Sequence, residues 1–442
     1  MKTRVKQAIL LLGPVLFIIW SMKKFKYGLL SKLWNVQLTG EMQHNFLRLN
    51  GIDHTTKIVL IYTNLYNLNL QKGYEIFSQC PLKNCYLTYN KNIRNKADMI
   101  IFNAFHVSSY PPLLHKPKNQ KWLFYLIESP YHIWRNFSMM GNMDYISTYT
   151  SDSDIVSPYG AYVPLDDRTH IIIEPTNFHS KSRLVAIIVS HCETPNNREL
   201  LIFQLSLFIP IHVYGNCEKK WRKKFEYDEV KSKIVFHTFP RIIARNNDTF
   251  LPNNMTIDSS NFDSENDENG DKICAYKEKE FENEKCLRYL GKNYKFYLSF
   301  ENSACKEYIT EKFWYNALSF NMLPVVYGPF RYEYREIGPP NSFIHAVEDS
   351  EGNVKMLADI IIKVGSSKAR YNRYFEWKKF GKVENYMMKG PTNQNPMWCT
   401  ICQKIMAFNE KLKLNKTDDQ KNSMAHKRFD WWWHPESMCI LT

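Results

Sequence analysis

Short apolar runs separated by mixed segments recur along this chain in two series, and this alternation restricts the possible folds more than any other feature. Runs of this length that end in turn-forming residues are typical of buried strands. The first series consists of KIVLIYTN from Lys57, DMIIF from Asp98, KWLFYLI from Lys121 and DYISTY from Asp144. Strands that alternate with mixed segments predict an α/β domain with a largely parallel sheet.

A second series begins with RLVAIIVS at Arg183, continues with helical periodicity over 197–208 and returns to a strand, IHVY, at Ile211. The 442 residues are too many for one ordinary core and suit two domains with appendages. The sequence therefore predicts an N-terminal domain over 55–178 and a C-terminal domain over 179–375.

An acidic stretch interrupts the second domain within residues 241–285. Six of the residues from Asp258 to Asp271 are acidic and almost none is apolar, so this stretch cannot bury enough surface to fold alone. It is predicted to be a solvated loop. A calcium-binding loop is the alternative, although the ligand spacing of an EF-hand is absent.

The N-terminus predicts a membrane anchor. Basic residues precede and follow an uncharged apolar run over 7–22, which is slightly short for an average bilayer. A cleaved signal peptide is the rival, but no small-x-small cleavage site follows Trp20. We therefore predict a cytoplasmic tail over 1–6, a transmembrane signal anchor over 7–22 and a stem over 23–54. Positive charge flanks both ends, so the charges barely set the orientation.

Two features favour a lumenal location for the remainder. Glycosylation acceptor patterns begin at Asn136, Asn247, Asn254 and Asn415, although single patterns also arise by chance. Ten cysteines are compatible with disulfides behind a signal anchor. Zinc binding by the two closely spaced pairs is one alternative, and buried free thiols are another, which best suits Cys192 and Cys305.

The run from Tyr294 to Gly328 predicts a strand, a loop, a helix and a second strand, with polar residues at the end of the first strand. Ligands of open α/β sheets bind at this end. A helix N-terminus offers free N–H groups to a diphosphate, and Lys312 in the first turn adds a full charge. Glu311, Asn302 and Tyr308 can bond the same ligand. The alternative is a surface helix with an ordinary Glu–Lys pair.

The net charge of +14 is scattered and attracts anions in general. Nucleic acid is disfavoured as a partner, because the sequence has no zinc-finger spacing, RNP-like run or basic helix with heptads. A nucleotide-sugar donor and an anionic membrane surface fit the charge better.

The run YKFYLSFENSACKEYITEKFWYNALSFNMLPVVYGP resembles the signature of the α1,3-fucosyltransferase family, glycosyltransferase family 10, with Glu307 where Asp is usual. The resemblance extends to an ESP triplet followed by a DSD-PYG segment within 122–160 and to residues 182–198. It covers roughly residues 55–400, interrupted by the acidic stretch. It implies a GT-B-like α/β fold, with two Rossmann-like domains facing a cleft behind an N-terminal transmembrane anchor and stem.

The family's activity would be an inverting transfer of L-fucose from GDP-fucose to the 3-hydroxyl of N-acetylglucosamine in a glycan, either the N-glycan core or N-acetyllactosamine. The resemblance implies that Glu128 is the general base and that Arg198 contacts the diphosphate. It makes Asn302, Tyr308, Glu311 and Lys312 donor-binding residues. Alternatively, Glu128 is a loop carboxylate that only caps a nearby helix, and Arg198 is an arginine at the start of a helix, exposed to water. Glu301 receives no role.

The family resemblance implies no required cofactor and no protein-bound metal, with stimulation by divalent cations left open. The pair Asp152 and Asp154 resembles the metal-binding DxD of other glycosyltransferases. Its distance in sequence from the donor segment favours a structural or acceptor-side role. The family consists of single-pass type II Golgi membrane enzymes with a lumenal catalytic domain, which sets the expected location.

The C-terminal tail over 376–442 resembles the family's cysteine-containing tail, with WCTIC at 398–402 and WWWHPESMC at 431–439. By resemblance, Cys80 and Cys85 would pair with Cys399, Cys402 or Cys439. The usual tail has an Arg-Pro and two close cysteines, whereas this one has His434-Pro435 and only Cys439, which leaves the pairing open.

Two other functions remain as hypotheses. One is a GT-B transferase that uses another nucleotide sugar, and the other is an inactive glycan-binding protein of the same fold. The acceptor glycan depends on loop shape in the first domain, which the sequence leaves open.

Overall fold

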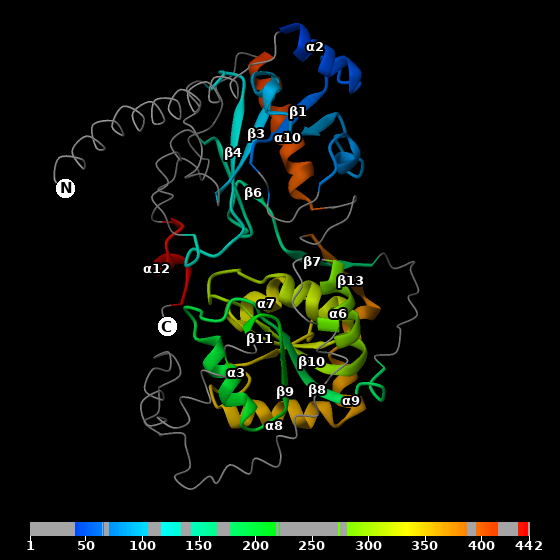
Figure 1. The fold of residues 1–442 in the computed structure, drawn as a ribbon, viewed down its shortest axis with the longest axis vertical. Helices are drawn as coiled ribbons and strands as arrows, with labels where there is room; N and C mark the ends of the chain where they lie inside the picture. Colours follow the sequence, from blue (N-terminus) through cyan, green and yellow to red (C-terminus); the bar gives the residue numbers. More distant parts are fainter. Residues whose placement is uncertain are drawn as a thin grey trace, which may run out of the picture.

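The computed structural model describes residues 40–63, 65, 70–104, 116–133, 143–165, 177–217, 221, 273–274, 281–386, 395–413 and 432–440. Two α/β sheets with their helices lie one above the other in an elongated molecule (Figure 1). The predicted anchor, the four glycosylation asparagines and the acidic loop over 258–271 lie outside the described residues. Within the described ranges, no helix is both long and apolar enough to cross a membrane.

The first sheet contains six parallel strands in the order β2-β1-β3-β4-β5-β6. Its members are β1 (Lys57–Ile61), β2 (Cys85–Thr88), β3 (Met99–Asn103), β4 (Lys121–Tyr125), β5 (Tyr145–Thr148) and β6 (Ile155–Val156). The four apolar runs of the first series are therefore confirmed as strands. The strands β2 and β6 were not predicted, because four and two residues are too few for a readable period.

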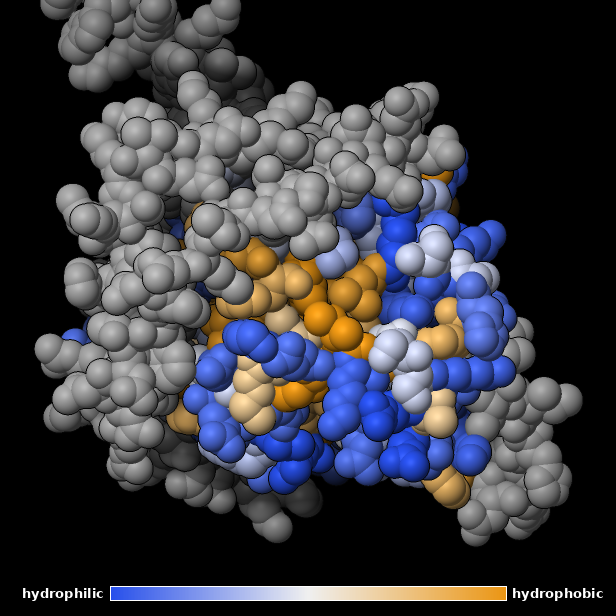
Figure 2. All heavy atoms as spheres, turned by 90° about the horizontal axis from the view of Figure 1, so that it is seen from below, coloured by the Kyte–Doolittle hydropathy of each residue, from blue (hydrophilic) through white to orange (hydrophobic). Residues whose placement is uncertain are grey.

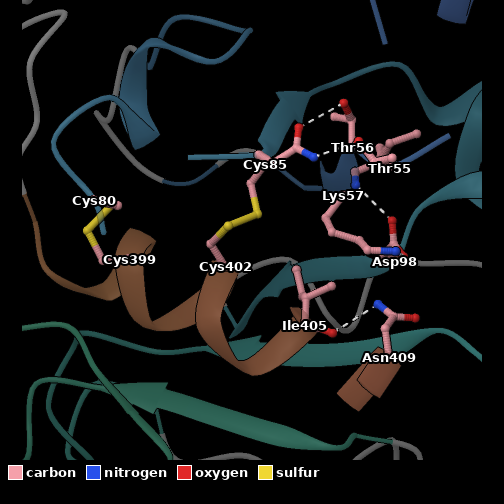
Figure 3. Close-up of a disulfide and its surroundings, with 12 residues drawn as sticks. Thr55, Thr56, Lys57, Cys80, Cys85, Asp98, Cys399, Cys402, Ile405 and Asn409 are labelled. Carbon is pink, nitrogen blue, oxygen red and sulfur yellow. Dashed lines mark hydrogen bonds and ion pairs between the residues drawn. A yellow bond between two sulfur atoms is a disulfide. The ribbon is translucent and has the colours of Figure 1, made fainter. Parts of the chain in front are cut away.

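One face of this sheet is covered by α10 (Met397–Lys413), which comes from the far end of the chain. Met397, Trp398 and Ile401 of the helix pack in one core with Val59 and Leu123 of the sheet. Two disulfides, Cys80–Cys399 and Cys85–Cys402, fasten the same helix (Figure 3). These two pairings agree with the expectation from the family resemblance.

The second sheet contains five parallel strands in the order β12-β11-β10-β8-β9. Its strands are β8 (Arg183–Ile188), β9 (Ile211–Tyr214), β10 (Tyr294–Phe300), β11 (Leu323–Tyr327) and β12 (Ile344–His345). The described helices around it are α3 (Arg198–Ser206), α6 (Phe281–Asn293), α7 (Arg331–Ile337), α8 (Val354–Gly365) and α9 (Lys368–Arg373). The central strand β10 buries Phe296 and Leu298 in one core and Tyr297 in another, so both of its faces are covered.

The predicted helix over 309–320 has a different geometry. Lys312–Ala317 forms a π-helix, η7, and Leu318–Phe320 forms a 3-10 turn, η8. Asn321 ends the segment in the left-handed region at φ 60°, which confirms the predicted stop. π-helical turns are rare in proteins, and those that occur are frequently found at functional sites.

Several short elements complete the described chain. The strands β7 (Gly160–Pro164) and β13 (Gly381–Asn385) form a small antiparallel ribbon. Residues near the N-terminus form α2 (Gly40–Leu49), and the tail ends in α12 (Pro435–Met438). The remaining 3-10 turns are η1 (Glu75–Phe77), η2 (Lys91–Lys96) and η9 (Glu376–Lys379).

Seen from below, apolar side chains gather near the centre of the visible surface, with hydrophilic ones below and to the right of them in this view (Figure 2). Figure 1 places α8 at this end, and Met356 and Ile362 of that helix are 40% and 46% exposed. The polar side chains predicted to form the functional site lie elsewhere, where the two sheets meet.

Candidate active site

The loop after β10 is organised by Glu301, which is fully buried. One carboxylate oxygen accepts the backbone N–H of Thr310 and the other accepts its hydroxyl, both at 2.8 Å. The ammonium of Lys312 lies 3.1 Å from the same carboxylate and donates to the Thr310 hydroxyl at 2.8 Å. Gly328 leaves room for this arrangement, because a Cβ there would lie 3.0 Å from Glu301 Cγ.

This network corrects the sequence-based view of the helix start. We expected free N–H groups of the first turn to await a diphosphate, yet the Thr310 N–H is already bonded to Glu301. The protein's own carboxylate therefore occupies the favourable anion position there. Lys312 and Glu311 remain at the predicted helix start, 3.1 Å apart.

The charges of this network are strongly coupled. Burial lowers the pKa of Lys312, but Glu301 and Glu311 outweigh it and hold that pKa above its ordinary value. Burial raises the pKa of Glu301 despite the opposing charge of Lys312. For the more exposed Glu311, burial acts upward but Lys312 lowers the pKa overall. Lys312 is therefore a fixed positive charge, only 17% exposed, at the end of β10.

We expect Lys312→Met to lower the melting temperature, because it leaves a buried carboxylate without its cation. Breaking such a pair by removing one partner costs about 3–5 kcal/mol. Thermal unfolding measures the change. Lys355→Met is the matched control, since Lys355 pairs with Asp359 on the exposed surface of α8. Equal melting temperatures for the two variants would contradict the assigned role of Lys312.

Glu128 follows β4 in the first sheet and meets the loop over 301–311, which follows β10 in the second sheet. One of its carboxylate oxygens accepts the Tyr308 hydroxyl at 2.5 Å and the Asn302 amide at 3.4 Å. The same oxygen accepts the Ser129 N–H at 2.9 Å. The hydroxyls of Ser129 and Ser303 share a further hydrogen bond of 2.8 Å across the same junction. Residues about 180 positions apart thus form one cluster.

Tyr308 is held rigidly in this cluster. Its ring lies 5.1 Å from Tyr149 and 6.2 Å from Tyr159, centroid to centroid. Burial, and next the charge of Glu128, raise the pKa of Tyr308 well above its ordinary value. The phenol therefore stays protonated and serves as a hydrogen-bond donor to Glu128.

Arg198 begins α3 as predicted, but it is buried and not a water-exposed helix-start residue. Its terminal nitrogens donate to the carbonyls of Phe300 at 2.7 Å and His191 at 2.9 Å. Burial lowers the pKa of Arg198, although a guanidinium remains protonated in proteins. The side chain thus ties the loop after β8 to the end of β10 and brings a positive charge to the junction.

The same two loops are joined by other contacts. The Asn196 amide donates to the Glu301 carbonyl at 2.9 Å, and the Tyr327 hydroxyl donates to the Asn196 carbonyl at 2.7 Å. A disulfide between Cys192 and Cys217 ties the loop after β8 to the segment after β9. Cys192 is therefore not a free thiol, contrary to one of our alternatives.

The C-terminal tail reaches the loop after β10 through a disulfide that was not predicted. Cys439 pairs with Cys305, and not with the cysteines of the first sheet. The Ile440 N–H donates to the Ala304 carbonyl at 2.7 Å, and the Lys306 N–H to the Met438 carbonyl at 2.6 Å. The free-thiol interpretation of Cys305 is wrong. All ten cysteines form disulfides, the remaining pair being Cys274–Cys286.

The Asp152–Asp154 pair does not converge on one point. Asp154 accepts the Ile146 N–H at 2.8 Å, whereas Asp152 accepts the Trp432 indole N–H at 3.2 Å and the Lys306 ammonium at 3.3 Å. These contacts give both carboxylates structural partners. Among the described residues, no three His, Cys, Asp or Glu side chains gather in a way that could hold a metal ion.

Sequence reasoning missed two parts of the site. Glu301 received no role, because strand alternation does not reveal which polar side chain at a strand end will be buried. The Ser129–Ser303 contact was also missed. The ENS and ESP triplets pointed to both loops but not to their proximity.

Two parallel α/β sheets, joined at the ends of their central strands, give this protein a GT-B-like architecture. A family profile described as "Fucosyltransferase, N-terminal" matches residues 54–160. A second, "Glycosyltransferase family 10 (fucosyltransferase) C-term", matches 178–239 and 270–421. The chain belongs to glycosyltransferase family 10.

Three named proteins are similar to this chain. The chain is 28% identical to glycoprotein 3-alpha-L-fucosyltransferase A of Drosophila melanogaster over 87% of its length and 61% of that protein. It is also 28% identical to alpha-(1,3)-fucosyltransferase 7 of Homo sapiens, over 72% of each chain. A crystal structure of an α1,3-fucosyltransferase with GDP aligns with 82% of this chain and 91% of that chain, at 16% identity and a TM-score of 0.43.

Proposed function

We propose that the protein is an inverting α1,3-fucosyltransferase. It transfers L-fucose from GDP-fucose to the 3-hydroxyl of N-acetylglucosamine in a glycan, either an N-glycan core or N-acetyllactosamine. Two similar proteins, a glycoprotein 3-alpha-L-fucosyltransferase and an alpha-(1,3)-fucosyltransferase, support the choice of sugar.

One observation carries the proposal. Glu128, the candidate base, shares hydrogen bonds with Tyr308 and Asn302, two candidate donor residues from the other sheet. A carboxylate beside the donor site is where an acceptor hydroxyl would need a base. Arg198 and Lys312 bring positive charge to the same loops.

The proposed mechanism is a direct displacement. The acceptor oxygen attacks the anomeric carbon of fucose while the bond from that carbon to the diphosphate breaks, and Glu128 takes the hydroxyl proton. The configuration inverts because attack and departure occur on opposite sides. Lys312 and Arg198 stabilise the negative charge that develops on the leaving GDP. Tyr308 and Asn302 orient the Glu128 carboxylate before the acceptor arrives.

The family resemblance also supports a cellular setting for this chain. We infer a single-pass type II Golgi membrane protein with the catalytic part in the lumen, glycosylated at Asn136, Asn247, Asn254 and Asn415. The donor is a substrate and no cofactor is required, while divalent cations are expected at most to stimulate the reaction.

A transfer assay tests the proposal. The lumenal chain is incubated with a glycan array and with GDP-fucose, GDP-mannose or a UDP-sugar in turn. We expect transfer from GDP-fucose alone, with an α1,3 linkage to N-acetylglucosamine in the product. Transfer from another donor would favour a different GT-B transferase, and glycan binding without transfer would favour an inactive relative.

A further inference from the structure

His132 lies where the loops after β4 and β10 meet, four residues after Glu128 in the loop that follows β4. The backbone N–H of His132 donates to the Ser129 carbonyl at 3.1 Å, so the backbone forms a turn here. Its ring packs edge-on against His191 of the second sheet, with centroids 4.8 Å apart and planes at 72°. The ring thus lies between the candidate base and the loop after β8.

The Nε2 atom of His132 is buried and has no hydrogen-bond partner among the described residues. Leaving a buried polar group unsatisfied costs about 1–3 kcal/mol. None of the functions assigned so far uses this atom. An unsatisfied nitrogen beside candidate donor residues indicates a partner that arrives with a ligand.

The charges that face the ring decide what that partner can be. They are the Glu128 carboxylate, the His191 ring and the Arg198 guanidinium, with the Asn302 backbone bonded to the ring as well. Burial lowers the pKa of His132, His191 and Arg198 act in the same direction, and Glu128 and Asn302 oppose them. The lowered pKa favours the neutral ring in the free protein. A diphosphate beside Arg198 would add negative charge and favour the protonated ring.

We propose that His132 takes up a proton from solvent when the nucleotide sugar binds, and that its Nε2–H donates a hydrogen bond to a diphosphate oxygen. No covalent bond to the ring forms, and the proton returns to solvent when GDP leaves. His132 is then a further catalytic residue, which stabilises the leaving group while Glu128 activates the acceptor. This inference rests on the proposed donor and deepens that assignment.

Calorimetric titration with GDP-fucose, without acceptor, tests the inference. GDP-fucose suits the test because its diphosphate is esterified at both ends and does not titrate near neutral pH. Binding enthalpies measured at pH 7.5 in buffers of different ionisation enthalpy give the number of protons taken up. We expect up to about one proton for the wild-type chain and none for His132→Gln. The variant is expected to bind about 10- to 100-fold more weakly, as for a lost hydrogen bond to a charged group.

His191→Gln is the matched control, because it removes the second ring and leaves His132 in place. It should retain proton uptake. If His132→Gln does not fold in a thermal melt, His132→Asn carries the same comparison. Proton uptake that persists without His132, or disappears with His191, would overturn the inference. GDP-fucose binding without proton uptake in the wild-type chain would overturn it as well. Failure of that chain to bind GDP-fucose at all would overturn the proposed function.

Discussion

Replacing Glu128 by Gln is expected to lower kcat for fucose transfer by about 100- to 10,000-fold, the usual contribution of a positioned base. The amide oxygen can still accept the Tyr308 hydroxyl and the Ser129 N–H, so the junction should stay assembled. It cannot take the proton of the acceptor hydroxyl. Steady-state kinetics with GDP-fucose and an N-acetylglucosamine acceptor measure the loss.

The affinity for GDP separates this role from a structural one. Because the loop after β10 keeps its contacts in the variant, its dissociation constant for GDP should stay within about twofold of the wild-type value. Glu336→Gln, on the exposed surface of α7, controls for the change in charge. Unchanged turnover in Glu128→Gln would remove Glu128 as the base, and a parallel loss of GDP binding would make it a donor-site residue instead.

Loss of the two disulfides of α10 is expected to be strongly non-additive. Each alone closes a loop of more than 300 residues, with sequence separations of 319 and 317. When one bond is present, the other closes only a ring of about eight residues, because Cys80 and Cys85 are neighbours and so are Cys399 and Cys402. Either disulfide alone therefore already removes most of the unfolded-chain entropy that the other would remove by itself.

The chain-entropy relation gives the expected sizes. Changing one pair to alanine should lower the free energy of unfolding by about 2–3 kcal/mol, and changing both by about 8 kcal/mol. The loss expected for the variant without both pairs is comparable with the whole free energy of unfolding of many domains. Chemical denaturation of the four proteins, wild type, each single-pair variant and the combined variant, measures the difference. A combined loss no greater than the sum of the two separate losses would refute this account.

The strands were predictable because their signal is local. A run such as KWLFYLI is apolar enough to be buried as a segment. The strands β4 and β10 lie where such apolar runs predicted them. The segment over 309–320 was placed correctly but not its turn geometry, because the Ser299 hydroxyl bonds the Lys312 carbonyl and residues of the strand thereby shape the turn. The helix signal in the sequence carries no information on such a contact.

Contacts between residues far apart in the sequence were harder to predict. The resemblance suggested that Glu128 and Tyr308 both serve the reaction, but only the fold brings them to 2.5 Å. Cys305 and Cys439 were separated by 134 residues with no local pattern to join them. The buried position of Glu301 also depends on packing between strands, which alternation along one strand cannot specify.

The origin of α10 has a consequence for biosynthesis. The first sheet consists of residues 57–156, yet the helix that covers its apolar face begins at Met397. During translation, Val59, Ile101 and Leu123 therefore lack this cover until the segment that begins at Met397 has been made. Apolar strands left open for that time are prone to aggregation. The nascent protein should consequently depend on chaperones and disulfide isomerases, and truncation before residue 397 should yield insoluble chains.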